Sequence, residues 1–104
     1  MPKKIYVDID GTICSNTEGK YEEAEPFQER IDFFNALYDE GHEIVYWTAR
    51  GMNSGANHKV LTKSQLKKWN VKHTKLVMKK PSYDIFIDDK AFNSDHFFSN
   101  GYFP

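Results

Sequence analysis

The chain has 104 residues, of which 39% are hydrophobic and 28% charged, and its formal net charge is −1. These values predict one compact globular domain over residues 1–104 and exclude a disordered chain. No apolar run approaches the ~20 residues of a membrane span, and the first residues are too polar for a signal peptide. A single cysteine fits a reducing compartment, so we expect a cytoplasmic protein with no membrane partner.

Charge is unevenly distributed along the chain. Residues 44–83 contain no acidic residue, but they include one arginine and eight lysines. This segment is either a solvated lysine-rich surface or an electropositive rim that attracts an anionic substrate. The near-neutral total argues against a general nucleic-acid-binding protein, so a nucleic acid is expected only as a substrate.

The first half of the chain predicts a strand, a loop and a helix. A short apolar run indicates a buried strand at residues 5–9, and the polar residues 11–25 indicate a loop or small hairpin. Pro26 is typical of the first turn of a helix, and Gly41 is typical of its left-handed end. The apolar residues between them predict a core-facing stripe of Phe27, Ile31, Phe34, Leu37 and Tyr38.

The second half predicts a strand at residues 43–48 and a loop at 51–57. A helix should begin between residues 57 and 62 and end at Trp69, with Thr62, Leu66 and Trp69 on its apolar side. Strands are predicted at residues 76–78 and 85–88, a short helix at 91–98, and a final strand at 102–103.

This alternation of strands and helices is typical of an α/β protein. Nearly continuous apolar strands indicate a parallel sheet with helices on both faces, that is, a three-layer Rossmann-like fold. Ligands bind such sheets beyond the carboxyl ends of the strands. The polar residues expected at that edge are Asp8, Asp10, Thr48, Lys79, Lys80, Asp88 and Asp89.

Four carboxylates at one edge repel one another unless a cation lies between them, and hard oxygen ligands favour Mg²⁺. The histidines and Cys14 have no zinc-ligand spacing. Mg²⁺ with nearby lysine and threonine is typical of phosphoryl transfer. A carboxylate such as Asp8 can attack phosphorus, and a second carboxyl such as Asp10 can protonate the leaving oxygen and later deprotonate water.

The sequence DIDGT at residues 8–12 resembles the signature of the haloacid dehalogenase superfamily of phosphatases. Further motifs follow in that family's order: WTARG at 47–51, KP at 80–81 and IDD at 87–89. The resemblance covers about residues 5–90 and implies the haloacid dehalogenase fold. A weaker similarity links residues 47–52 and 87–91 to small phosphatase-like proteins associated with capsular or surface polysaccharide synthesis.

The resemblance also implies roles for the residues of the first motif. Asp8 would be the nucleophile that forms an aspartyl-phosphate, and a ligand of Mg²⁺. Asp10 would be the general acid and base, and its backbone carbonyl would bind the metal. Because family members that only transfer phosphate for ion transport carry threonine in place of Asp10, the resemblance implies hydrolysis by water.

The later motifs would bind the substrate and complete the metal site. Thr48 and Ala49 would contact the phosphoryl group, and Lys80 would neutralise both Asp8 and that group, with Lys79 as the alternative. Arg50 would either contact the substrate phosphate or form a surface salt bridge. One of Asp88 and Asp89 would complete the metal shell. The implied catalytic residues are Asp8, Asp10, Thr48 and Lys80; the implied metal ligands are Asp8, Asp10, Asp88 and Asp89.

Two departures from the family pattern are visible. Residues 11–25 and 51–57 leave no room for the cap domain that many members carry, so the site should be open. An open site suits a bulky substrate or a cap supplied by a second copy of the chain, and a homo-oligomer is compatible with this. Related sequences resemble Gly-Lys-Pro at the third motif, whereas this chain has Lys79 before Lys80.

We therefore expect an enzyme, an Mg²⁺-dependent phosphatase acting on a small-molecule or polymer-end phosphomonoester. Sugar phosphates, nucleotides and phosphorylated nucleic-acid ends are the substrate classes left open. One alternative is a phospho-acceptor module like a signalling receiver, although there the acidic pair precedes the acceptor aspartate. The other is a non-catalytic or decayed binding or assembly protein that keeps the same fold.

Overall fold

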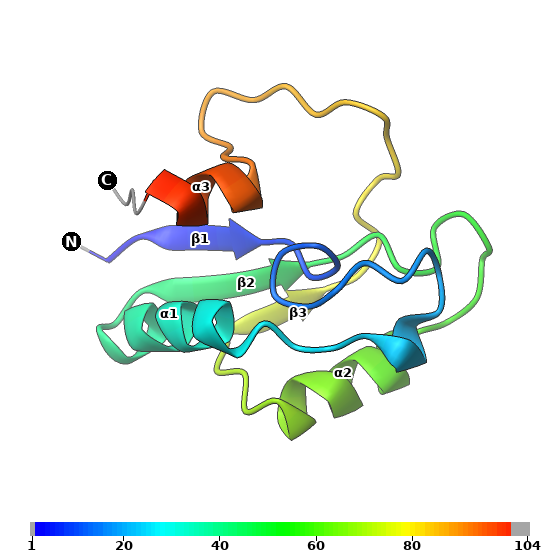
Figure 1. The fold of residues 1–104 in the computed structure, drawn as a ribbon, viewed down its shortest axis with the longest axis horizontal. Coiled ribbons are helices and arrows are strands. Elements are labelled where there is room, and N and C mark those ends of the chain that lie inside the picture. Colours follow the sequence, from blue (N-terminus) through cyan, green and yellow to red (C-terminus); the bar gives the residue numbers. More distant parts are fainter. Residues whose placement is uncertain (1, 101–104) are drawn as a thin grey trace.

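The computed structural model describes residues 2–100, which form a small α/β domain (Figure 1). Its described strands, all parallel and in the order β1-β2-β3, are β1 (Lys4–Val7), β2 (Glu43–Trp47) and β3 (Lys75–Val77). The helices are the 3-10 helix η1 (Tyr21–Glu23), α1 (Gln28–Asp39), α2 (Lys59–Lys68) and α3 (Ser94–Asn100). The predicted parallel sheet with helices is thus confirmed, whereas the strand predicted at 102–103 lies outside the described residues.

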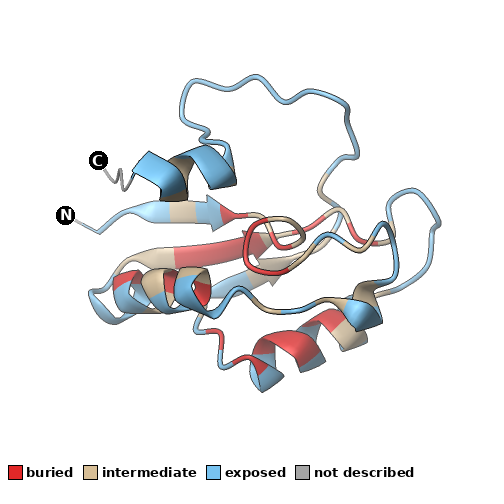
Figure 2. Cartoon of the chain, in the orientation of Figure 1, coloured by how far each residue is buried: buried red, intermediate tan, exposed pale blue. Residues whose placement is uncertain are grey.

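The central strand, β2, is the most deeply buried part of the sheet (Figure 2). Ile44 and Tyr46 belong to the same hydrophobic core cluster as Val7 of β1, and Tyr46 is paired in register with both Val7 and Leu76. Val45 is also buried but lies outside that cluster, because successive side chains of a strand point to opposite faces.

Both long helices bury one stripe against this core. The buried residues of α1 are Ile31, Phe34 and Leu37; those of α2 and its C-cap are Thr62, Gln65, Leu66 and Trp69. The predicted stripe of α1 is therefore correct at its centre and wrong at its ends, since Phe27 and Tyr38 are 36% and 39% exposed. Both lie at the ends of the helix, beyond the width of the sheet-facing contact.

The start of α1 differs from the prediction by two residues. Pro26 was expected in the first turn, but it pairs with Cys14 in an isolated antiparallel bridge. The N–H of Phe27 then donates to the carbonyl of Ile13 at 2.7 Å, so the chain is still paired with the loop after β1 at that point. At the other end Gly41, with φ of +98°, ends the helix as predicted.

The helix α2 begins at Lys59, within the predicted range of 57–62. Thr62 does not cap it, because Thr62 lies inside the helix and its hydroxyl donates to the carbonyl of His58 at 2.8 Å. Within residues 2–100, the longest helix has 12 residues, and none is long and apolar enough to cross a membrane.

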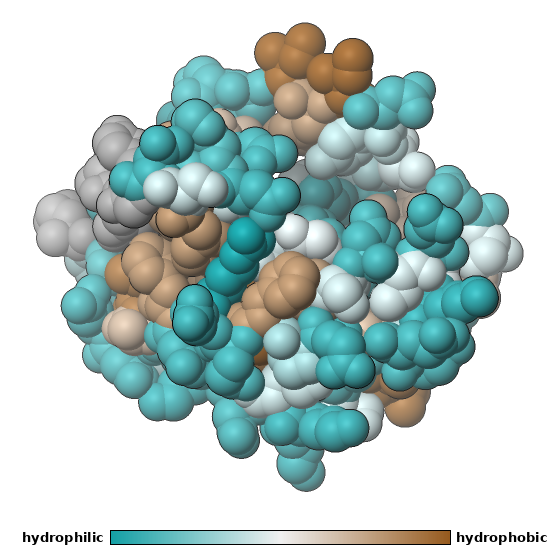
Figure 3. Space-filling model, in the orientation of Figure 1, coloured by the Kyte–Doolittle hydropathy of each residue, from teal (hydrophilic) through white to brown (hydrophobic). Residues whose placement is uncertain are grey.

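The predicted strand at residues 85–88 is wrong. Residues 78–93 contain no strand, and Ile85 and Ile87 are 77% and 92% exposed. Figure 3 shows apolar surface at the top of the molecule, where this segment runs in Figure 1. An apolar, β-branched run forms a strand only where another strand pairs with it, so the local pattern was insufficient.

The last helix, α3, forms three residues later than the predicted start at residue 91 and lies beside β1 (Figure 1). It also contacts α1. The ring of Phe98 lies 5.4 Å from that of Phe33 and 5.6 Å from that of Phe34, both in edge-to-face geometry. Arg30 of α1 pairs with Asp95 at 2.8 Å, which fixes the two helices to each other.

Replacement of Ile31 by alanine should lower the free energy of unfolding by about 2–5 kcal/mol, because Ile31 is fully buried between α1 and the sheet. The control is Val60→Ala on α2, where the side chain is 80% exposed and the change should stay within about 0.5 kcal/mol. Urea denaturation measures both. Equal losses in the two variants would contradict the assignment of the core.

Candidate functional site

A cleft of about 650 Å³ opens where β1 and β2 end. Six residues predicted for the site line it: Asp8, Asp10, Thr48, Ala49, Arg50 and Lys80. Parts of residues 16–21, 51–58 and 81–83 line the rest of the cleft. The carboxyl edge of the sheet therefore gathers most of the predicted groups, as expected for parallel strands.

Asp8 is the first residue after β1, and two side chains contact its carboxylate. Its Oδ2 accepts a hydrogen bond from the Thr12 hydroxyl at 3.1 Å, and its Oδ1 lies 3.4 Å from Nζ of Lys80. Burial raises the pKa of Asp8, although Lys80 and the Thr12 hydrogen bond act in the opposite direction. The side chain is 37% exposed, so its carboxylate can be reached from the cleft.

The structure distinguishes the two candidate lysines. Lys80 is partly buried, lines the cleft, and lies over the rings of Trp47 and Tyr83 at 5.5 and 5.4 Å. Lys79 is exposed and has a φ of +70°, a left-handed conformation that suits glycine. Lys80 is therefore the residue beside Asp8, and the backbone at residue 79 explains why a glycine is favourable there.

Thr48 joins the ends of β2 and β3. Its N–H donates to the carbonyl of Val77 at 3.1 Å, and its own carbonyl accepts from the N–H of Lys80 at 2.9 Å. Its Oγ1 accepts from the N–H of Arg50 at 3.2 Å, which leaves the hydroxyl hydrogen to donate. Thr48 is 1% exposed, so it is part of the floor of the cleft.

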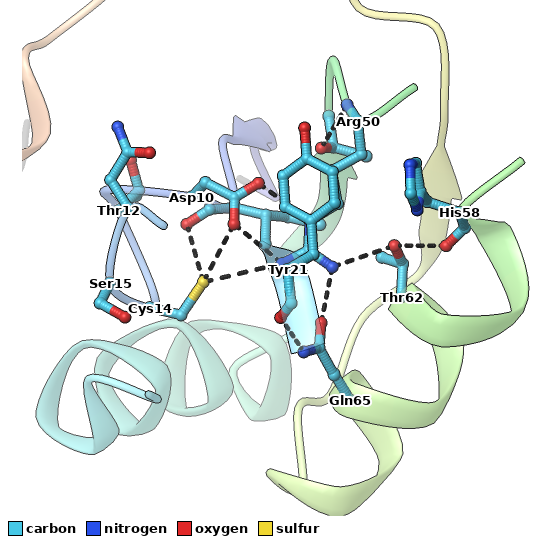
Figure 4. A network of polar contacts seen from close by, with 12 residues as sticks. Asp10, Thr12, Cys14, Ser15, Tyr21, Arg50, His58, Thr62 and Gln65 are labelled. Atoms are coloured by element: carbon cyan, nitrogen blue, oxygen red, sulfur yellow. Dashed lines mark hydrogen bonds and ion pairs between the residues drawn. The ribbon is translucent and has the colours of Figure 1, made fainter. Parts of the chain in front are cut away.

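Arg50 does not have the role that the sequence predicted. Its side chain is fully buried and forms a two-pronged pair with Asp10, in which Nε–Oδ2 is 2.9 Å and Nη2–Oδ1 is 2.8 Å (Figure 4). Burial disfavours the charge, but Asp10 outweighs it and holds the pKa of Arg50 above its ordinary value. The guanidinium is thus committed to Asp10 rather than presented to a substrate phosphate.

Asp88 and Asp89 do not join the other two carboxylates. Both are exposed, neither lines the cleft, and Asp88 instead accepts from the N–H of Lys90 at 2.9 Å. Within residues 2–100, no three histidine, cysteine or acidic side chains come together as a metal-binding group. The four-carboxylate site is therefore not assembled, because the strand expected to carry Asp88 is absent from residues 78–93. Of the four predicted metal ligands, Asp8 and Asp10 line the cleft.

The structure adds residues that sequence reasoning did not place in the site. Thr12 donates a hydrogen bond to Asp8, and Thr62 and Gln65 accept hydrogen bonds from the guanidinium of Arg50. The signal for Thr12 was its place in the DIDGT motif. The sequence predicts Thr62 only on the apolar side of a helix, and nothing local links Thr62 or Gln65 to Arg50.

The lysine-rich segment contributes little to the cleft. Of the eight lysines in residues 44–83, all within the described part of the chain, only Lys80 lines it. For the remaining lysines the structure therefore favours a solvated surface over an electropositive rim.

Comparisons with known proteins support the fold. A search of solved structures matches a crystal structure of a structural-genomics target from Vibrio cholerae, with a TM-score of 0.83 and 27% sequence identity. The match covers 93% of this chain and 88% of that chain. No protein-family model matches the sequence, and no curated protein matches it. The chain is thus similar in fold to that bacterial protein, and this likeness carries no information on activity.

Asp8→Asn should stabilise the protein at neutral pH. Because burial raises the pKa of Asp8, folding is penalised while the carboxylate is ionised. That penalty is complete above the raised folded-state pKa and disappears below the ordinary value of 3.8. Thermal melts should show a higher Tm for Asp8→Asn at pH 7 and equal values at strongly acidic pH. A lower Tm for the variant at pH 7 would contradict the assigned environment.

Lys79→Gly should raise the free energy of unfolding by about 0.5–1 kcal/mol. The left-handed φ of Lys79 costs roughly 1–2 kcal/mol for a residue with a Cβ, and the greater flexibility of glycine in the unfolded chain cancels part of the gain. Lys67→Gly, inside α2, is the matched control and should lower stability by about 1 kcal/mol. Guanidinium titration compares them; equal losses would show that residue 79 is not strained.

Proposed function

We propose that this chain is an Mg²⁺-dependent phosphatase with the three-layer fold of the haloacid dehalogenase superfamily, and that it hydrolyses a phosphomonoester through an aspartyl-phosphate on Asp8. The observation that carries the proposal is the environment of Asp8. Its carboxylate reaches the cleft, and the ammonium of Lys80 and the hydroxyl of Thr12 lie against it. Thr48 and Asp10 line the same cleft. A carboxylate next to a fixed cation is suited to attack an anionic phosphoryl group.

In the first step an oxygen of Asp8 attacks phosphorus. The new O–P bond forms as the bond to the leaving oxygen breaks, and Asp10 gives that oxygen a proton. Lys80, 3.4 Å from Asp8, offsets the charge of the nucleophile and of the phosphoryl oxygens as they approach each other. The hydroxyl of Thr48, whose oxygen already accepts from Arg50, donates to the transferred group.

In the second step water attacks the phosphorus of the aspartyl-phosphate. Asp10, now a carboxylate, accepts a proton from that water, and the O–P bond to Asp8 breaks. Inorganic phosphate leaves, and both carboxyl groups return to their starting states. The same pair of residues thus serves both halves of the reaction.

The metal part of the proposal rests on Asp8. Mg²⁺ commonly uses only one or two protein carboxylates, together with phosphate oxygens and water, so one accessible carboxylate is compatible with it. When bound, the ion would neutralise charge on the phosphoryl oxygens. The open cleft suits a sugar phosphate, a nucleotide or the phosphorylated end of a nucleic acid.

The direct test is hydrolysis of 4-nitrophenyl phosphate with Mg²⁺ and with EDTA. We expect turnover in Mg²⁺, its loss in EDTA, and a fall of at least about 10³-fold in kcat for Asp8→Asn, which keeps the shape but not the nucleophile. The matched control is Asp39→Asn. Asp39 is an exposed carboxylate that pairs with Lys72, and this variant should keep wild-type activity.

An acid-quenched reaction adds a second readout. Mass spectrometry should find the phosphoryl group on the peptide that contains Asp8. Equal turnover by the wild type and Asp8→Asn would exclude Asp8 as the nucleophile. No turnover of any of the three substrate classes, with no phosphorylated peptide, would favour the decayed or non-catalytic alternative.

A further inference from the structure

Arg50 is the most fully engaged polar side chain in the described part of the cleft. A guanidinium has five N–H donors, and each here has an acceptor. Nε and one Nη2 hydrogen go to the two oxygens of Asp10. The Nη1 hydrogens go to Thr62 Oγ1 at 3.1 Å and Gln65 Oε1 at 2.6 Å, and the last Nη2 hydrogen faces Cys14 Sγ at 3.9 Å.

The position of Arg50 is itself fixed by two separate parts of the chain, η1 and α2. The ring of Tyr21, from η1, lies 4.7 Å from the centre of the guanidinium and stacks on it (Figure 4). Gln65 of α2 accepts from Arg50 and donates through Nε2 to the carbonyl of Tyr21 at 2.6 Å, which closes the network. Thr62 is held by its bond to the His58 carbonyl. These contacts hold the guanidinium of Arg50 in one orientation.

The two oxygens of Asp10 are not equivalent in this arrangement. Oδ1 accepts from Arg50 Nη2 and from the Cys14 thiol at 3.6 Å, whereas Oδ2 accepts from Arg50 Nε alone. Each carboxylate oxygen can accept about two hydrogen bonds, so Oδ2 keeps one position open. The side chain of Asp10 is 18% exposed, and Asp10 lines the cleft, so it can be reached from there.

We infer that Arg50 is the positioning residue for Asp10, and that proton exchange with the leaving group and with water takes place at Oδ2 of Asp10. This inference rests on the proposed phosphatase function. Arg50 fixes the plane of the carboxylate by two parallel hydrogen bonds, which lysine cannot reproduce.

A contribution to stability alone does not explain the position of the Asp10–Arg50 ion pair. A buried pair requires the removal of two charges from water, and apolar residues of similar size often stabilise a fold equally well. The pair also lies at the wall of the cleft, where Asp10 is its partly exposed member and Arg50 its buried one. Orientation of Asp10 accounts for that placement.

The test compares two substrates that differ in their need for a proton. The leaving group of 4-nitrophenyl phosphate departs readily as an anion, whereas an alkyl phosphate such as propyl phosphate needs protonation. The ratio of kcat/KM for propyl phosphate to that for 4-nitrophenyl phosphate reports only the steps up to leaving-group departure. For Arg50→Lys we expect this ratio to fall about 10- to 100-fold.

Three further variants separate positioning from stability. Asp10→Asn should lower the same ratio, and Arg50→Lys in that background should lower it no further, because the group being positioned is already gone. Thr62→Val removes one hydrogen-bond acceptor of Arg50 and should lower the ratio less than Arg50→Lys does. If a thermal melt shows that Arg50→Lys does not fold, Thr62→Val replaces it in the test. The control, Lys72→Arg, changes a residue of the exposed pair with Asp39 and should leave the ratio unchanged.

The outcomes are distinguishable from a failure of the proposed function. If Asp8→Asn abolishes turnover but the folded Arg50 and Thr62 variants lose activity equally on both substrates, Arg50 is structural and the inference is overturned. If the wild type and Asp8→Asn turn over both substrates equally, or neither does, the proposed function fails and the inference fails with it. An additive loss in the double variant would also overturn it.

Discussion

The parallel pairing of β2 with a strand on each side is the constraint on which the cleft depends. Parallel strands that pair in register end at the same edge, and here the backbone bonds continue past the strands themselves. Thr48 donates to Val77 and accepts from Lys80, so the ends of β2 and β3 are joined. Because Ile44 and Tyr46 of β2 are fully buried, any shift of this register would expose core side chains and is strongly disfavoured.

The two carboxylates of the first motif lie in different electrostatic environments. Asp8 is reachable from the cleft beside the single ammonium of Lys80, whereas Asp10 is bound by two N–H groups on one edge of a buried guanidinium. Two chemically identical groups, two residues apart, thereby have different environments, which is what the two separate roles in the proposed mechanism require. The division depends on residues distant in the sequence, since Lys80 follows β3 and the partners of Arg50 come from η1 and α2.

The segment from residue 78 to 93 illustrates the limit of local pattern. Its apolar run has the composition of a strand, yet both of its ends are held at the carboxyl edge: Lys80 by the carbonyl of Thr48, and the hydroxyl of Ser94 by the carbonyl of Gly11. Between these points the chain runs outward, and Ile87 is 92% exposed. Asp88 is carried away from Asp8 with it, and the acidic cluster inferred from spacing is not formed.

The sequence by itself determined the α/β class, the three described strands, α1 and α2 to within about two residues, and the convergence of Asp8, Asp10, Thr48 and Lys80 at one edge. Those features follow from periodicity and from the geometry of parallel strands, which are local or topological. Only the tertiary structure decided that Lys80 rather than Lys79 faces Asp8, that Arg50 turns inward to Asp10, and that residues 85–88 stay unpaired. Each of these depends on contacts between segments distant in sequence, whose energies no local pattern encodes.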